Sequence, residues 1–207
     1  MAAFDELGAR DSIYVPAALA KNIHDCDGYV DTMSFWTFDD VFEEEGVVKE
    51  PFHGGFGLIG AGGIKKPSFY GFSLLHNLGQ ARLANKADDL LVTRRKDGTL
   101  VIALWNLVDF DKAHSGTAKT VRLVFTGQAG LSSATIRRVD ADHGDPMPAY
   151  RAMGSPRYPT QKQVAAMNAA SALPSPEHAA IIKNSLEVTL PVNGLAVIEI
   201  PTSAKKR

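Results

Sequence analysis

The sequence has little that points to secretion, a membrane or nucleic acid. Its 207 residues include a single cysteine, Cys26, which excludes an internal disulfide framework, and they include no Asn-x-Ser/Thr glycosylation acceptor. The net charge of −1 gives no basic surface for nucleic acid or an anionic membrane. The N-terminus lacks the basic and apolar regions of a signal peptide, and no apolar run approaches the roughly 20 residues that cross a bilayer. We therefore expect a cytoplasmic protein with no nucleic-acid or membrane partner.

The first part of the chain has an α/β pattern. Apolar residues make up 45% and charged residues 22% of the sequence, as in globular proteins. Residues 11–26 have helical spacing and Pro16 near their start, and residues 68–83 have a second helical pattern opened by Pro67. Between them, YVDTMSFWTF at 29–38 is apolar on both faces toward its end, which predicts a strand buried on both sides. Helix, strand, loop and helix form one and a half α/β units.

From about Leu90 onward the apolar period changes to two. LLVTRR and TLVIALWNLV flank Asp97-Gly98 and predict a hairpin. Four further alternating segments predict strands at 120–125, 134–140, 186–190 and 195–200. These segments are typical of a β-sandwich or small barrel. Within the interruption from His143 to Asn184, QKQVAAMNAA and PEHAAIIKN predict two short helices.

The stretch from Ser34 to Gly57 carries the side chains most relevant to function. Trp36, near the end of the predicted strand, suits either a core position or a platform for the apolar face of a sugar ring. Asp39, Asp40 and residues 43–45 place five acids within seven positions. Such a run suits a solvated loop or the binding of sugar hydroxyls, whereas the spacing of a calcium loop is missing.

Two glycine-containing segments need a special backbone. His53-Gly54-Gly55-Phe56-Gly57 predicts a bend with positive φ, and it is not a nucleotide-binding fingerprint. The residues from Asp140 to Asp145 favour an Asp/Gly turn over a metal site. The sequence contains no GxSxG, HExxH or P-loop motif.

Several motifs, in order along nearly the whole chain, resemble glycoside hydrolase family 39, the retaining β-xylosidases. They are SFWTFDDVFEEEG, PFHGGFGLI, GIKKPSFYGFSLLHNLG, LLVTRRKDGTLVIALWN and DHGDPMPAYRAMGSPRYPTQKQV. The α-L-iduronidases belong to the same family, but the unbroken WTFDDVFEE and FHGGFG strings look more like the xylosidase branch.

The resemblance implies a fold and a set of site residues. The expected fold is α/β plus all-β: residues 1–86 form the C-terminal part of a (β/α)₈ TIM barrel, and residues 87–203 form a β-sandwich with a helical insertion at about 156–183. Trp36 would be the sugar platform, Glu43 and Glu44 would bind xylose hydroxyls, and Phe42 and His53 would help to shape the pocket. The implied ligands are xylose-containing oligosaccharides, with no cofactor or metal, and the full-length enzyme is a candidate homo-oligomer.

The catalytic residues implied by the family lie outside this sequence. Family members use one glutamic acid as acid/base and one glutamate as nucleophile, with carboxyl groups about 5 Å apart. The strings that carry them, similar to Asn-Glu-Pro and Thr-Glu-Trp/Tyr-Asn, do not occur in this chain. We expect both upstream of the matched region, and we therefore expect the 207-residue chain alone to be inactive. The alternative is a non-catalytic carbohydrate-binding or packing module.

Overall fold

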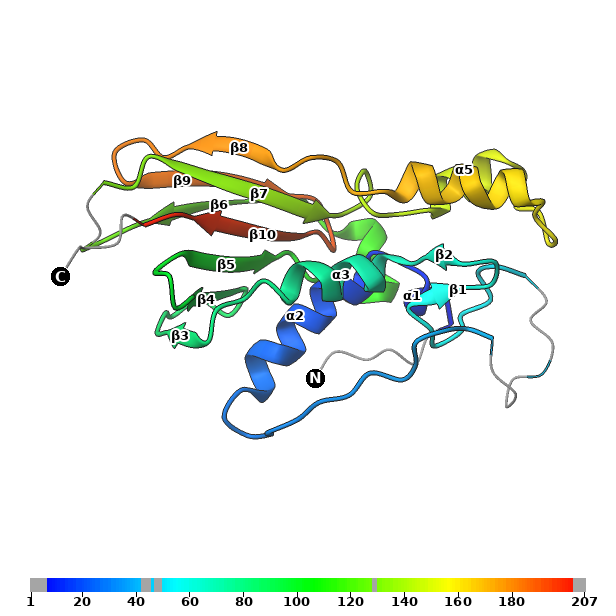
Figure 1. Cartoon of the computed structure of the whole chain (residues 1–207), viewed down its shortest axis with the longest axis horizontal. Coiled ribbons are helices and arrows are strands. Elements are labelled where there is room, and N and C mark those ends of the chain that lie inside the picture. Colours follow the sequence, from blue (N-terminus) through cyan, green and yellow to red (C-terminus); the bar gives the residue numbers. More distant parts are fainter. Residues whose placement is uncertain (1–6, 42–45, 47–49, 128–129, 203–207) are drawn as a thin grey trace.

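A six-stranded antiparallel sheet forms the centre of the molecule. The computed structural model describes residues 7–41, 46, 50–127 and 130–202. A two-stranded ribbon covers one face of the sheet and two helices cover the other face (Figure 1). The sheet runs, in spatial order, through β3 (Ala81–Leu83), β4 (Leu90–Arg94), β5 (Leu100–Trp105), β10 (Leu195–Ile200), β7 (Ser133–Val139) and β8 (Glu177–Ala180). The ribbon pairs β6 (Lys119–Val124) with β9 (Ser185–Leu190).

Alternation along the central strands divides the core into two layers. In β5, Ile102 and Leu104 belong to the apolar cluster facing the ribbon, while Ala103 and Trp105 belong to the cluster facing the helices. Every residue of β5 is buried, so this strand contributes to both layers along its whole length. A strand buried on both faces therefore explains the continuous apolar run TLVIALW.

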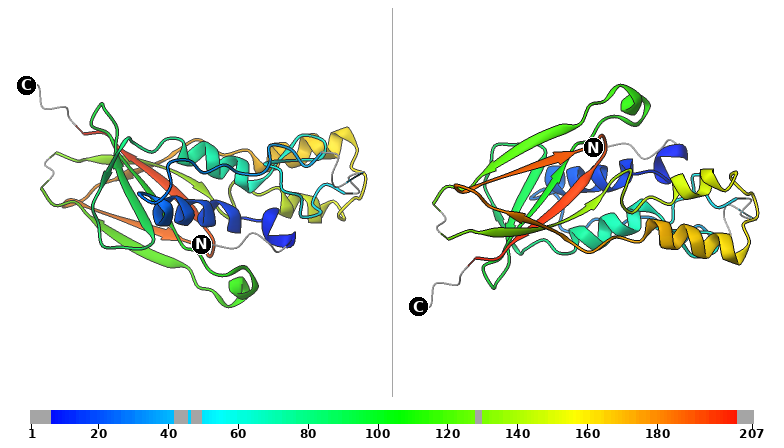
Figure 2. Two further views of the ribbon diagram at one scale, coloured as in Figure 1. Left: turned by 90° about the horizontal axis from the view of Figure 1, so that it is seen from below. Right: turned by 90° about the horizontal axis from the view of Figure 1, so that it is seen from above.

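Two helices cover the other face of the sheet. They are α2 (Tyr14–Cys26) and α3 (Pro67–Leu75), and the short α1 (Leu7–Arg10) precedes them. A β-carbon on Gly71 would lie 3.1 Å from the Cα of Pro16, so the missing side chain allows α2 and α3 to pack closely. The views of Figure 2 show both helices against the sheet and a further helical segment extending beyond its end.

Most of the predicted strands are confirmed. The hairpin around Asp97-Gly98 forms as β4 and β5, and the four segments predicted downstream form as β6, β7, β9 and β10. The structure is thus an antiparallel, sheet-rich sandwich in its second half. The second predicted helix is too long: α3 ends at Leu75, and β3 begins at Ala81. A β-carbon on Gly79 would lie 2.2 Å from the backbone of Arg94, so the chain turns there onto the edge of β4.

Between His143 and Asn184, one of the two predicted helices is present and the other prediction is wrong. QKQVAAMNAA forms α5 (Gln161–Ser171), whose N-terminus is capped by reciprocal bonds between Thr160 and Gln163. The sequence analysis did not predict α4 (Met147–Ala152). PEHAAIIKN is not a helix, because Glu177–Ala180 pairs antiparallel with β7 and forms the sheet edge β8. Pairing with β7 outweighs the helix propensity of its two alanines.

The strand predicted at 29–38 is not formed. The segment is extended, and its end bonds to residues 56–59: Thr37 donates to Phe56, Phe38 accepts from Ile59, and a parallel bridge joins Asp39 to Ile59, but the described residues form no regular ladder there. Its apolar side chains are consequently exposed rather than buried on two faces, Tyr29 by 88% and Phe38 by 65%. A barrel fragment in this region therefore remains a prediction, as does the division at residue 86. The helices of residues 7–86 share one apolar cluster with the sheet.

The remaining elements are a short hairpin and a 3₁₀ helix. The short hairpin of β1 (Ile59–Gly60) and β2 (Ile64–Lys65) packs beside α5, and the 3₁₀ helix η2 (Phe110–Ser115) contacts the start of α2. Within the described part of the chain, no helix has the length and apolar character needed to cross a bilayer.

Candidate functional site

Trp36 lies on the surface, at the end of the extended segment. Its side chain is 65% exposed in this chain, as is that of Phe38. The next residue, Thr37, donates its backbone N–H to the carbonyl of Phe56 at 3.1 Å. This bond ties the segment that carries Trp36 to the glycine-rich bend.

A cavity lies beside Trp36. It has a volume of about 280 Å³, and its lining from Trp36, Phe56 and α2 is mainly apolar. Arg10 is the charged residue in the lining; its guanidinium stacks 3.8 Å from the centre of the Phe56 ring and donates to the carbonyl of Gly54. Trp36 therefore lies beside a mainly apolar surface, with the guanidinium of Arg10 at its edge.

The 53–57 bend needs glycine for two reasons. Gly54 has φ of +79°, as the sequence predicts. Gly55 and Gly57 are required by close packing instead, because a β-carbon on either would lie 2.4 Å from Asp40 or from the backbone beside it. The sequence analysis missed this second reason, because the contacts involve residues distant in the chain.

Asp40 is buried, in contrast to the prediction of a solvated or sugar-facing acidic loop. Its side chain lies 2.6 Å from the ammonium of Lys66 and accepts a 2.6 Å hydrogen bond from the N–H of Gly57. Lys66 also lies 2.6 Å from Asp11 and donates to the carbonyl of Gly55 at 2.9 Å. We call Asp11, Asp40 and Lys66 the buried ionic cluster.

The buried ionic cluster carries one positive group and two carboxyl groups. Burial is the largest cause that raises the pKa of Asp40 above its ordinary value, and the charge of Asp11 raises it further. Lys66 and the Gly57 N–H oppose that shift. Neither Asp11 nor Lys66 was singled out from the sequence, and we find no sequence signal for them, because their partners lie far apart in the chain.

The other predicted site residues differ in what the structure describes. His53 is partly buried at the start of the bend, and its Nδ1 lies 3.0 Å from the carbonyl of Glu50. Phe42, Glu43 and Glu44 lie outside the described residues. Their roles, and the sugar-contacting roles of Trp36 and His53, remain predictions.

The Asp140–Asp145 segment is a turn, as predicted. Asp140 and His143 exchange backbone hydrogen bonds, and the His143 ring lies 2.6 Å from the Asp140 carboxylate. No group of three or more potential metal-ligating side chains is found in the part of the chain that the structure describes.

Comparison with known proteins identifies the family. The family described as "Glycosyl hydrolases family 39" matches residues 7–186. This chain belongs to glycosyl hydrolase family 39. It is 36% identical over 192 residues to a β-xylosidase of Geobacillus stearothermophilus, and 31% identical over 196 residues to one of Caldicellulosiruptor saccharolyticus.

The family-39 chain spans well under half the length of these relatives. The two alignments include 87% and 90% of this chain but 37% and 39% of the relatives. A monomeric β-xylosidase from Caulobacter crescentus CB15 has the same fold, with a TM-score of 0.78 at 24% identity. The likeness covers 95% of this chain and 43% of that one.

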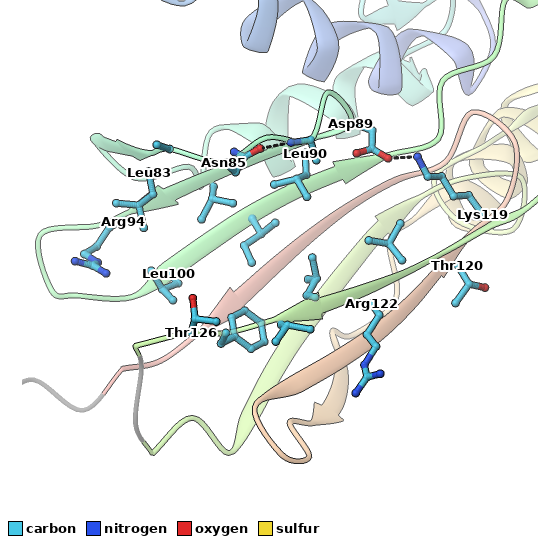
Figure 3. Close-up of a pocket in the computed structure, with 18 residues that line it drawn as sticks. Leu83, Asn85, Asp89, Leu90, Arg94, Leu100, Lys119, Thr120, Arg122 and Thr126 are labelled. Carbon is cyan, nitrogen blue, oxygen red and sulfur yellow. Dashed lines mark hydrogen bonds and ion pairs between the residues drawn. The ribbon is translucent and has the colours of Figure 1, made fainter.

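A second, larger cleft of the family-39 chain lies on the other side of the sheet from the cavity beside Trp36. It has a volume of about 650 Å³ and opens between the β3–β4 edge of the sheet and β6 (Figure 3). Its walls combine aliphatic side chains and Phe125 with polar side chains such as Arg94 and Arg122, and Lys119 and Asp89 form an ion pair at its rim. The described residues to which the family resemblance assigns sugar contacts, Trp36 and His53, do not line this cleft, so the Trp36 surface is kept as the candidate site.

Proposed function

We propose that this chain forms the sugar-binding wall of a retaining β-xylosidase. The complete enzyme would release xylose from the non-reducing end of β-1,4-xylo-oligosaccharides. Two relatives above 30% identity, both named β-xylosidase, support the xyloside branch of the family over the iduronide branch.

The exposure of Trp36 is the observation that carries this proposal. A pyranose presents an apolar C–H face that packs on an aromatic ring such as an indole. Trp36 is 65% exposed on a segment that the bend holds from one side. By family resemblance, Glu43 and Glu44 would accept hydrogen bonds from the sugar hydroxyls, and Phe42 and His53 would complete the pocket.

The bond-breaking carboxylates would come from sequence outside this chain. One glutamic acid would protonate the leaving oxygen while a glutamate attacks the anomeric carbon; water then hydrolyses the glycosyl-enzyme intermediate with retention. We propose that α2, the 29–38 segment and α3 are the last units of the (β/α)₈ barrel that carries both residues. The chain itself would supply binding and positioning, so we expect it to hydrolyse nothing detectable.

A titration of the isolated chain with xylose tests the binding proposal. Trp36→Ala should abolish the xylose-dependent change in tryptophan fluorescence. Phe38→Ala is the matched control, because Phe38 is equally exposed and lies two positions away. No response in the wild type, or a response that survives Trp36→Ala, would contradict the proposal.

An activity assay tests the assignment of catalysis to absent residues. The purified chain should release no aryl leaving group from an aryl β-xyloside. Turnover by this chain that disappears in Glu43→Gln would overturn the assignment.

A non-catalytic carbohydrate-binding module is the second candidate, because the exposed Trp36 lies on a chain whose helices and sheet share one apolar core. The two candidates differ in the coding sequence before Met1. An in-frame extension with two glutamate motifs supports the xylosidase, whereas its absence supports the binding module.

A further inference from the structure

Lys66 joins three chain segments beneath the proposed sugar-binding wall. Its ammonium contacts Asp11 before α2, Asp40 at the end of the extended segment, and the carbonyl of Gly55 in the bend. The three distances are 2.6, 2.6 and 2.9 Å. The ammonium therefore lies at ion-pair distance from two carboxylates and donates a hydrogen bond to one carbonyl, each on a different segment.

The carboxylates of Asp11 and Asp40 also bind the backbone of the 54–57 bend. The second oxygen of Asp11 accepts from the N–H of Gly54 at 2.7 Å, and that of Asp40 accepts from the N–H of Gly57 at 2.6 Å. Asp40 also donates its own N–H to the carbonyl of Ile59 at 2.9 Å. Both ends of the bend are thus fixed to groups that Lys66 holds.

Stability alone does not account for a charged cluster at this place. Lys66 and Asp40 are fully buried, and Asp11 nearly so. Taking these charges out of water is costly, and apolar residues of similar volume often stabilise a buried site as well or better. What the charges supply is directed contact: each fixes the position of a particular backbone group.

We propose that Lys66 is a positioning residue for sugar binding, which holds residues 37–40 against the 54–57 bend and so sets the orientation of Trp36 and His53. Its side chain is fully buried, so it acts through these segments and does not touch the sugar. The inference rests on the proposed function and adds to it the residue that organises the site.

Two variants of the full 207-residue chain test the inference. Lys66→Met removes the ammonium but leaves two buried carboxylates without it, so it risks unfolding. The triple variant Asp11→Asn/Asp40→Asn/Lys66→Met removes all three charges, and its amide oxygens remain available to Gly54 and Gly57. This variant retains hydrogen-bond acceptors for the bend while losing the contacts made by the ammonium.

Fluorotryptophan labelling provides a readout that a purely structural role would not move. The chain contains two tryptophans. Trp105 is buried in the sheet and serves as the internal reference, while Trp36 reports on the wall. In the triple variant we expect the Trp36 fluorine signal to shift or broaden while that of Trp105 stays in place. Exchange of the Gly54 and Gly57 amides should become faster, and xylose affinity should fall about tenfold or more.

Leu190→Ala is the matched control, because Leu190 is fully buried in the sandwich core, away from the bend. It should lower the melting temperature without moving the Trp36 signal or the two amides. Equal changes in this control and in the Lys66 variants would show a merely structural role and overturn the inference. The inference would also be overturned if the triple variant had the same Trp36 fluorine signal and the same Gly54 and Gly57 amide exchange rates as the wild type.

The design separates this inference from the proposed function. The fluorine signal and amide exchange need no sugar, so they judge Lys66 even if the wild type does not respond to xylose. If the wild type does not respond to xylose but the Trp36 fluorine signal still moves in the triple variant, xylose binding is rejected and the role of Lys66 is not. If the wild type responds to xylose and the triple variant responds equally, the role of Lys66 is rejected and xylose binding is not.

Discussion

At the scale of residues, the candidate site places side chains contrary to their hydrophobicity. Lys66 and Asp40 are buried, whereas Trp36 and Phe38 are exposed. Contiguous exposed apolar side chains mark surfaces that contact a ligand or another part of a protein, whereas buried charges carry a desolvation cost. The residue scale is therefore where the structure says most about function.

The stability of the chain should depend on pH through Asp40. Its pKa is raised in the folded state, chiefly by burial, so its contribution to stability is present below the unfolded pKa of about 3.9 and is lost as the pH rises through the folded pKa. In Asp40→Asn the side chain does not ionise, so the variant does not lose stability in this way as the pH rises. The free energy of unfolding of the variant, minus that of the wild type, should rise as urea titrations move upward from pH 4.

Asp25→Asn is the control for this experiment. Hydrogen bonds from Lys21 and His24 lower the pKa of Asp25, so its contribution is lost only as the pH falls below about 4. The difference between this variant and the wild type should stay flat above pH 5. A flat or falling difference for Asp40→Asn would contradict the prediction.

Gly57→Ala should loosen the bend by steric overlap. The added β-carbon would lie 2.4 Å from the backbone at Asp39 and Asp40, and overpacking of this kind costs about 1–3 kcal/mol of unfolding free energy. Urea titration measures that loss, and the fluorine signal of Trp36 should shift with it.

Gly63→Ala is the comparison for Gly57→Ala. Gly63 has φ of +81° with nothing within 4 Å of an added β-carbon. This variant should lose about 1–2 kcal/mol from backbone strain without moving the Trp36 signal. An unchanged Trp36 signal in Gly57→Ala would mean that the close packing of the bend does not orient the wall.

At the scale of elements, the α4–α5 insertion supports the hairpin that follows the bend. Met167 and Ile64 are fully buried against each other and Tyr150, whose ring packs 4.9 Å from that of Phe52. Asn168 accepts from the N–H of Lys65 and donates to the carbonyl of Gly63. The insertion thus contacts the candidate site through Phe52, the neighbour of His53.

Met167→Ala should destabilise this support. Truncation of a fully buried methionine costs about 2–5 kcal/mol, and amide exchange at Lys65 should become faster because its acceptor lies on the same helix. Lys162→Ala, on the exposed face of α5, should stay within about 0.5 kcal/mol of the wild type. Equal protection of the Lys65 amide in both variants would show that α5 does not support the hairpin.

The predictable elements are those whose signals are local. Period-two alternation and the Asp97-Gly98 turn identify the strands, and Pro67 marks the start of α3, because these signals act between neighbouring residues. β8 was missed because its pairing with β7 is a tertiary contact. Trp36 could be proposed as a site residue because the chemistry of an indole is visible in one residue, whereas the Lys66 cluster depends on segments that meet only after folding.

At the scale of the whole molecule, the two halves of the sequence share one core. The helices α2 and α3 bury the face of the sheet formed by Val101, Trp105 and Val197. The ring of His24 on α2 also lies 5.8 Å from that of Trp105. The sheet is therefore covered on its second face by residues that the sequence assigns to another domain.

A chain of residues 87–207 tests the predicted division at residue 86. Removal of the preceding residues exposes the Trp105 face and deletes the edge strand β3, which pairs with β4. At about 25 cal/mol per Å² of apolar surface, losing this cover should remove much of a domain's net stability. We expect the shorter chain to aggregate or to melt without a cooperative transition, while the 207-residue chain melts in one step by circular dichroism and Trp105 fluorescence. A dispersed NMR spectrum and a sharp transition for residues 87–207 would instead establish the sandwich as an independent domain, with the helices as part of a neighbouring one.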